Sequence, residues 1–243
     1  MTQLSPPRFV ATPTWGTLAR VLAKPLQVRT SSRVVALDRE AGDWSLALED
    51  GSTSGPFDRI LLTIPGPQAA QLLGSASADL AALASRIPTT RCWTGMLRFA
   101  EPVAAPLDLV ESSDPAAVVR SAARESSRPG RPGHSCWTVQ AGAEWSQAWW
   151  ERDPAEVAAA LADDLARVLG QSLPARVETR AHRWGFADCG LQVAEGSGPE
   201  ALLKDGLGLA GDGLGVGASG LEAAWSSAQE MIRLAAPSAG SIC

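Results

Sequence analysis

The stretch that decides the fold is Gly206-Leu-Gly-Leu-Ala-Gly-Asp-Gly-Leu-Gly-Val-Gly-Ala-Ser-Gly220. Its apolar start predicts a buried strand over Leu207–Ala210, and the glycine-rich turn leads into a helix expected over residues 217–234. Gly215-Val-Gly-Ala-Ser-Gly220 has the spacing G-x-G-x-x-G of a dinucleotide-binding turn. A complete unit of that kind also needs a second strand and an acidic residue about 20 residues later. Residues 235–243 provide neither, so we exclude an independent Rossmann domain built on this turn.

Two interpretations of the turn remain open from the local sequence. In the first, backbone N–H groups at the start of the helix face an anionic ligand, and Asp212 accepts hydrogen bonds from a sugar-like chain. In the second, the glycines only reverse the chain direction and Asp212 caps the helix. Local residue types favour neither interpretation over the other.

Composition narrows the class of protein. The 243 residues are 45% hydrophobic and 19% charged, as in an ordinary globular protein of one large or two small domains. A net charge of −5 argues against nucleic acid, and apolar runs such as Arg59–Pro65 are too short for a bilayer. The four cysteines are isolated, there is no signal peptide pattern and only two histidines occur. We therefore expect a cytoplasmic protein without a metal site.

Upstream of the turn, hydrophobic periodicity predicts a mixed fold. The expected helices cover residues 15–23 (with one buried face), 68–73, 78–86, 144–152 and 153–169, and the expected strands cover residues 26–30, 33–38, 44–49, 60–64 (buried on both faces), 92–99, 107–110, 135–140 and 176–184. Asp153, Pro154 and Glu156 form a clear helix start. Ser54-Gly55 is expected in a turn, and residues 121–133 in a surface loop. The order of elements predicts an α+β or α/β protein without regular βαβα alternation.

Several segments, taken in order, resemble the flavin-dependent amine oxidases and renalases. Leu207–Asp212 followed by Leu221–Gln229 is similar to the C-terminal flavin motif of that family, and Ala181–Ala187 to the strand before it. The middle flavin-domain segment and the loop and helix before it are matched by Ser32–Asp38, Trp44–Gly51, Phe57–Pro65 and Arg8–Ala19. The resemblance implies a partial FAD-binding, Rossmann-like domain with a smaller β-sheet-plus-helix substrate domain. It places middle and C-terminal flavin segments at residues 1–75 and 186–243, and the substrate domain at residues 76–185.

The resemblance also implies which residues hold FAD. The backbone of Val34 is expected at the adenine end, and Gly211 and Asp212 near the ribityl–pyrophosphate region. The expected neighbours of the isoalloxazine at the helix N-terminus are Val216, Gly217, Leu221 and Glu222. The family has glycine after the helix glutamate, where this chain has Ala223.

The family opens with a strand, a G-x-G-x-x-G turn and a helix, and no such unit precedes Arg8. We therefore expect a separate chain to supply the missing FAD-binding unit. The resemblance implies an oxidoreductase that transfers hydride from an amine or a reduced-nicotinamide-like substrate to flavin. The alternative is a flavin-free remnant that serves as a binding or interaction module and exposes an apolar patch to its partner.

A candidate substrate pocket consists of Trp145, Trp149 and His182. The two tryptophans are spaced to share one helical face and could form an aromatic wall beside a flat substrate. The alternative is that this face packs in the core and that His182 has a structural role.

Overall fold

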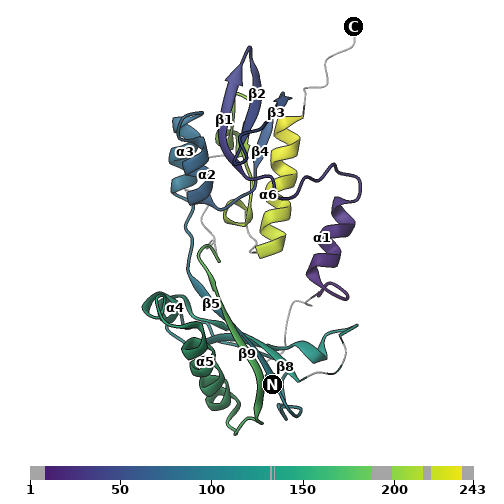
Figure 1. Ribbon diagram of the computed structural model, residues 1–243, viewed down its shortest axis with the longest axis vertical. Coiled ribbons are helices and arrows are strands. Elements are labelled where there is room, and N and C mark those ends of the chain that lie inside the picture. Colours follow the sequence, from purple (N-terminus) through teal and green to yellow (C-terminus); the bar gives the residue numbers. More distant parts are fainter. Residues whose placement is uncertain (1–8, 132, 134, 188–198, 216–219, 237–243) are drawn as a thin grey trace. The chain divides into compact units, whose positions relative to one another are not determined.

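The computed structural model describes residues 9–131, 133, 135–187, 199–215 and 220–236. The chain forms two compact units: unit 1 comprises residues 1–29 and 91–184, and unit 2 comprises residues 30–90 and 185–243. Both mix helices with sheets (Figure 1), which confirms the predicted mixed class. The resemblance assigns three functional segments, at residues 1–75, 76–185 and 186–243, and this division stays a prediction. Units 1 and 2 are instead defined by the contacts within each of them.

Unit 1 is built on an antiparallel sheet of five strands. Their order is β6-β7-β8-β5-β9, and their bounds are Leu109–Glu111 (β6), Val119–Arg124 (β7), Cys136–Ala141 (β8), Cys92–Phe99 (β5) and Arg176–Trp184 (β9). Register pairs Trp93 with Arg183 and Thr94 with His182. Because side chains alternate along a strand, the two pairs point to opposite faces of the sheet.

Two helices cover the Trp93 face, α4 (Ala143–Ala148) and α5 (Pro154–Leu169). Gly95 lies so close to α5 that a Cβ built on it would be 3.0 Å from Leu161. The predicted start of α5 is confirmed, since the carboxylate of Asp153 accepts a hydrogen bond from the Ala155 N–H at 2.7 Å. The helix ends at Gly170, whose φ of 65° is the left-handed conformation that glycine adopts most readily.

The N-terminal part of unit 1 differs from expectation. Helix α1 (Trp15–Ala23) has the predicted bounds and is capped by Thr14, but none of its residues is buried, so the predicted buried face is wrong. Residues 26–30 form no strand, because no neighbouring strand pairs with them among the described residues. The predicted loop at residues 121–133 is wrong in its first part. There β7 pairs with β6 and β8, and Ala122 is fully buried.

Unit 2 combines two three-stranded sheets with three helices. One sheet is antiparallel, in the order β1-β2-β3, with bounds Val34–Glu40, Asp43–Leu48 and Thr53–Phe57. The other has the order β10-β11-β4, with bounds Leu203–Lys204, Leu207–Leu209 and Ile60–Leu62. The helices are α2 (Gly66–Leu73), α3 (Ala78–Ser85) and α6 (Gly220–Ala235). The predicted turn at Ser54-Gly55 is wrong, because both residues belong to β3.

Strand β4 is parallel to β11 and occupies one side of its sheet. Leu62 is buried in the core of unit 2, but Leu61 is 37% exposed and Ile64 is also exposed. The predicted burial of this strand on both faces is therefore wrong. An uninterrupted apolar run indicates a strand that can be covered on both faces, but it cannot show that the cover is present.

Within the described residues, no helix combines the length and the apolar character needed to cross a membrane.

Candidate functional site

The Gly-Asp turn begins where β11 leaves the core of unit 2. All three residues of β11 are buried between β10 and β4. The backbone N–H of Gly211 donates to the hydroxyl of Ser227 on α6 at 3.0 Å. This bond fixes the end of the strand against the middle of the helix, and a short 3-10 turn over Asp212–Leu214 follows.

Close backbone packing determines the path after Asp212. A Cβ built on Gly215 would be 2.4 Å from the Cα of Ala223 and 2.5 Å from its Cβ. Ala223 is fully buried under this turn. The residue that departs from the family pattern therefore packs inside unit 2.

Asp212 and Gly211 are accessible to a ligand. Asp212 is half-buried, and among the described residues its carboxylate has no hydrogen-bond or ion-pair partner. A Cβ on Gly211 would meet nothing within 4 Å, so open space lies beside the backbone here. Residues 212–214 form a 3-10 turn and Gly215 belongs to no helix, which argues against Asp212 as the cap of α6. Of the two interpretations, the geometry favours the ligand site.

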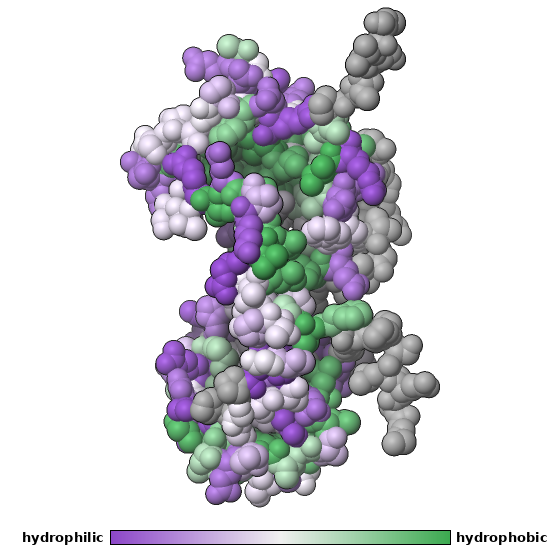
Figure 2. Space-filling model, turned by 90° about the vertical axis from the view of Figure 1, so that its right-hand side faces the viewer, coloured by the Kyte–Doolittle hydropathy of each residue, from purple (hydrophilic) through white to green (hydrophobic). Residues whose placement is uncertain are grey.

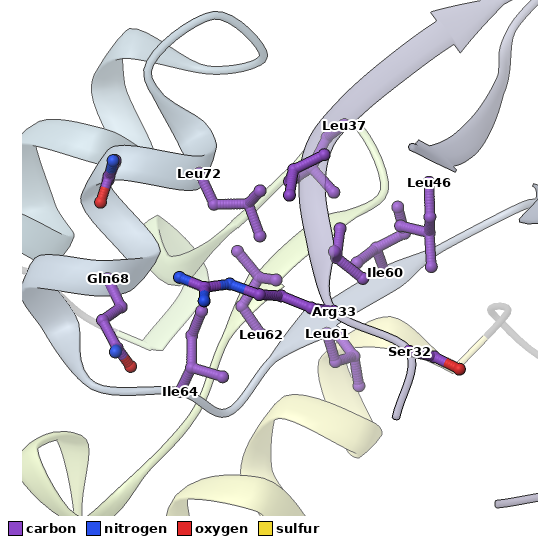
Figure 3. Close-up of a pocket in the computed structure, with 13 residues that line it drawn as sticks. Ser32, Arg33, Leu37, Leu46, Ile60, Leu61, Leu62, Ile64, Gln68 and Leu72 are labelled. Carbon is purple, nitrogen blue, oxygen red and sulfur yellow. The ribbon is translucent and has the colours of Figure 1, made fainter. Parts of the chain in front are cut away.

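Val34 lines a second part of the candidate site. It belongs to a pocket of about 730 Å³ between β1, β4 and α2, within the size range of cofactor pockets. Leu37 from β1, Leu62 from β4 and Leu72 from α2 point into this pocket (Figure 3). The pairing of β1 with β2 skips Val35, which marks a bulge directly beside Val34. Val34, whose backbone is predicted to contact the adenine end, thus lies at the irregular start of β1 with an apolar pocket beside it.

The remaining predicted flavin contacts are partly outside the described residues. Leu221 and Glu222 lie in the first turn of α6, and both side chains are exposed. Val216 and Gly217 lie outside the described residues, so their positions stay a prediction.

The three predicted substrate contacts do not come together. Trp145 and Trp149 stack at 4.6 Å between ring centroids and pack against the core of unit 1. The indole N–H of Trp93 donates to the Trp149 carbonyl at 3.0 Å, so these tryptophans lie on the Trp93 face of the sheet. His182 lies on the opposite face with Trp184, at 4.4 Å between rings. The helical spacing of Trp145 and Trp149 correctly predicts that the two side chains lie together. The strand register, which places His182 on the other face of the sheet, cannot be predicted from that spacing.

An ion pair accounts for two of the shifted pKa values. A hydrogen bond from Lys204 on β10 lowers the pKa of Asp79 on α3, and the same contact raises the pKa of Lys204. Both side chains are exposed, so the pair makes a surface contact between these elements.

Known structures support this description of the fold. The chain is similar to a crystal structure from Exiguobacterium sp. 255-15 named "Putative protoporphyrinogen oxidase", with a TM-score of 0.64 and 22% sequence identity. The match covers 90% of this chain and 50% of the solved chain. The two proteins therefore share a fold, and this chain spans about half the length of its solved relative.

The sequence model of the family described as flavin containing amine oxidoreductase matches residues 8–229. The chain belongs to this family, which confirms the resemblance inferred from its motifs. It also confirms flavin as the family's cofactor and oxidoreduction as the family's chemistry.

The described residues fit part of such a cofactor. The space beside Gly211 admits a ligand to the backbone, and the unpartnered carboxylate of Asp212 can accept hydroxyl hydrogen bonds from a sugar-like chain. The pocket beside Val34 is apolar enough for a flat ring. Apart from the turn between β11 and α6, the described residues contain no glycine-rich turn with a strand before it and a helix after it that would bind a pyrophosphate.

Proposed function

We propose that this chain provides the C-terminal part of a cytoplasmic, FAD-dependent oxidoreductase of the renalase or amine-oxidase type. Its substrate is an amine or a reduced-nicotinamide-like compound, and the enzyme is complete only with a further dinucleotide-binding unit. Family membership supports the redox class. The four cysteines are isolated from one another in the sequence, which supports the compartment.

The observation that carries the proposal is the position of Asp212. In open α/β sheets, ligands bind beyond the carboxyl ends of the strands. Asp212 lies beyond the carboxyl end of β11, half-buried and without a partner among the described residues. A carboxylate in that position, next to open space at Gly211, is suited to accept hydrogen bonds from the polyhydroxylated chain of a cofactor.

Each part of the site has a different task. A flavin held at this site would supply the redox chemistry, which is the acceptance of hydride from the substrate. Asp212 orients the sugar-like chain, and the backbone at Val34 contacts the adenine end. Glu222 and Leu221 line the approach to the ring at the first turn of α6. Ser227 acts indirectly, because its hydroxyl fixes Gly211 in place.

Replacing Asp212 tests the proposal. Asp212→Ala is expected to weaken FAD binding about tenfold, equivalent to ~1.4 kcal/mol, because it removes a charged hydrogen-bond acceptor. The measurement is quenching of flavin fluorescence in the form of the protein that binds FAD, with Asp58→Ala as a solvent-exposed control in unit 2. An unchanged dissociation constant for Asp212→Ala would argue against the assigned role. Thermal unfolding should be the same for both variants.

A flavin-free interaction module is the second candidate, and exposed apolar residues favour it. Leu61 on β4 and Trp225 on α6 are both exposed in unit 2. Exposed apolar side chains of this kind are typical of a surface that binds a protein partner, which is the task of an interaction module. Binding of a partner without any flavin binding would support this second function over the first.

A further inference from the structure

Charge is distributed unevenly along the chain. The first 37 residues hold five of its 21 basic residues and none of its 26 acidic ones, the first of which is Asp38. Residues 38–243 therefore hold 16 basic and 26 acidic residues, a net charge of −10, whereas the whole chain carries −5. A basic segment on an otherwise acidic chain is typical of a part that binds a negatively charged surface.

Helix α1 lies in this basic segment and is amphipathic. At 100° per residue, Trp15, Leu18 and Leu22 lie within an arc of about 60°, and Arg20 and Lys24 lie on the opposite side. Trp15 is 44% exposed and Leu22 is 48% exposed, and no residue of α1 is buried. Figure 2 views the molecule from the side on which Figure 1 draws α1, and hydrophobic side chains lie open to solvent there beside hydrophilic ones. The helix thus keeps an apolar side that the described residues do not bury.

The chemistry of this side suits a lipid surface. Among the side chains of its apolar arc, only Trp15 carries a hydrogen-bonding group, the indole N–H, and tryptophan is enriched where lipid headgroups meet the hydrocarbon. The apolar surface continues past the helix with Leu26 and Val28, which are also exposed. The basic residues are spread along the segment, from Arg8 to Arg33, and so match a broad negative surface better than a single acidic group on a protein.

The start of α1 is attached to unit 1. The guanidinium Nε–H of Arg131 donates to the carbonyl of Pro13 at 3.1 Å. A Cβ built on Gly130 would be 2.9 Å from the Cγ2 of Thr12, so the two backbones approach closely here. Thr14 then caps the helix by accepting a hydrogen bond from the Thr17 N–H. Whatever binds the apolar side of α1 is therefore held next to unit 1.

We propose that α1 and the basic segment around it bind the surface of a bilayer that contains anionic lipid. The apolar side, formed by Trp15, Leu18 and Leu22, inserts between the headgroups, and Arg20 and Lys24 remain on the aqueous side. A helix that lies in the interface needs no membrane-spanning length. The cytoplasmic leaflet is negatively charged, so this binding is compatible with the proposed compartment. The inference goes beyond the flavin site and does not depend on it.

Flotation of the full chain with lipid vesicles tests the proposal. The vesicles contain phosphatidylglycerol and phosphatidylcholine in equal amounts, or phosphatidylcholine alone, and no FAD is added. The chain is expected to float with the anionic vesicles and to stay in solution with the neutral ones. Raising the salt concentration from about 0.1 M to about 1 M should weaken the binding, because salt screens the attraction between the basic segment and the lipid.

Two variants separate insertion from charge attraction, each with a matched control. Leu22→Glu places a charge on the apolar side and is expected to weaken vesicle binding at least about tenfold. Leu107→Glu makes the same change at another exposed leucine of unit 1, 59% exposed, and should bind as the unchanged chain does. Arg20→Glu should also weaken binding, whereas Arg59→Glu, at an exposed arginine of unit 2, should not. All four positions are exposed, so the circular dichroism spectra should be the same.

Three results would overturn the proposal. The first is a chain that does not float with anionic vesicles. The second is equal binding of Leu22→Glu and Leu107→Glu, which would mean that charge alone attracts the segment, as an acidic protein surface also would. The third is equal binding to anionic and neutral vesicles. None of these results bears on flavin binding, which is measured separately.

Discussion

Gly215→Ala is expected to destabilise unit 2 by about 3 kcal/mol, the upper part of the usual range for overpacking. The added methyl group would be 2.4–2.6 Å from backbone and Cβ atoms of Ala223. Those atoms belong to a regular helix and cannot move as a side-chain end can. The turn after Asp212 must therefore shift away from α6, and the candidate flavin site shifts with it.

Calorimetry is the measurement, because it can resolve the unfolding of the two units. Gly211→Ala is the control: its Cβ meets nothing within 4 Å and its backbone is extended, so the unfolding temperature should hardly change. Equal stability of the two variants would contradict the close packing of Gly215 on Ala223. For a domain of this size, 1 kcal/mol corresponds to roughly 4 °C in unfolding temperature.

Trp93→Ala is expected to destabilise unit 1 by about 3–5 kcal/mol, as for other buried aromatic residues. Trp93 is fully buried in the core between the sheet and its helices. Its loss would leave a large cavity and remove the hydrogen bond to the Trp149 carbonyl. The guanidinium of Arg183, 5.7 Å from the ring, would lose a cation–π contact as well.

Trp225→Ala provides the comparison at an exposed position. The same truncation there should change the unfolding free energy by no more than about 0.5 kcal/mol. Urea unfolding followed by circular dichroism measures both. A loss of unfolding free energy at Trp225 as large as that at Trp93 would mean that the Trp225 side chain on α6 is already covered in solution.

Local chemistry made some elements predictable. Helix α5 follows from Asp153, Pro154 and Gly170, because a cap at each end and an amphipathic pattern between them are encoded in adjacent residues. The strand before Gly211-Asp212 follows in the same way from a short apolar run before glycines. The family resemblance rested on the order of such local segments.

Tertiary relations were not predictable from the same patterns. The Ile60–Ile64 run has the composition of a strand covered on both faces, whether or not a neighbour is present to cover Leu61. Strand β7 has a polar, arginine-containing sequence and forms because β6 and β8 provide partners on both sides. Propensity gives no information on partners distant in sequence.

In the candidate site, too, the features encoded in adjacent residues were predictable and the tertiary relations were not. Asp212 was identifiable from its place after a buried strand, and its open surroundings agree with the ligand interpretation. The sequence predicts that Trp145, Trp149 and His182 line one substrate pocket. The register of β5 against β9 places them on opposite faces of one sheet, and no local pattern carries that register.

The most direct test of the proposed flavin site is the absorbance spectrum of FAD between roughly 350 and 500 nm, recorded with this chain alone and with the chain joined to a dinucleotide-binding unit. A perturbed, bound flavin spectrum is expected with the joined form, and a weaker one or none with this chain alone. A free flavin spectrum with the joined form at high micromolar concentration would contradict the proposal that this chain forms the C-terminal part of a flavin site.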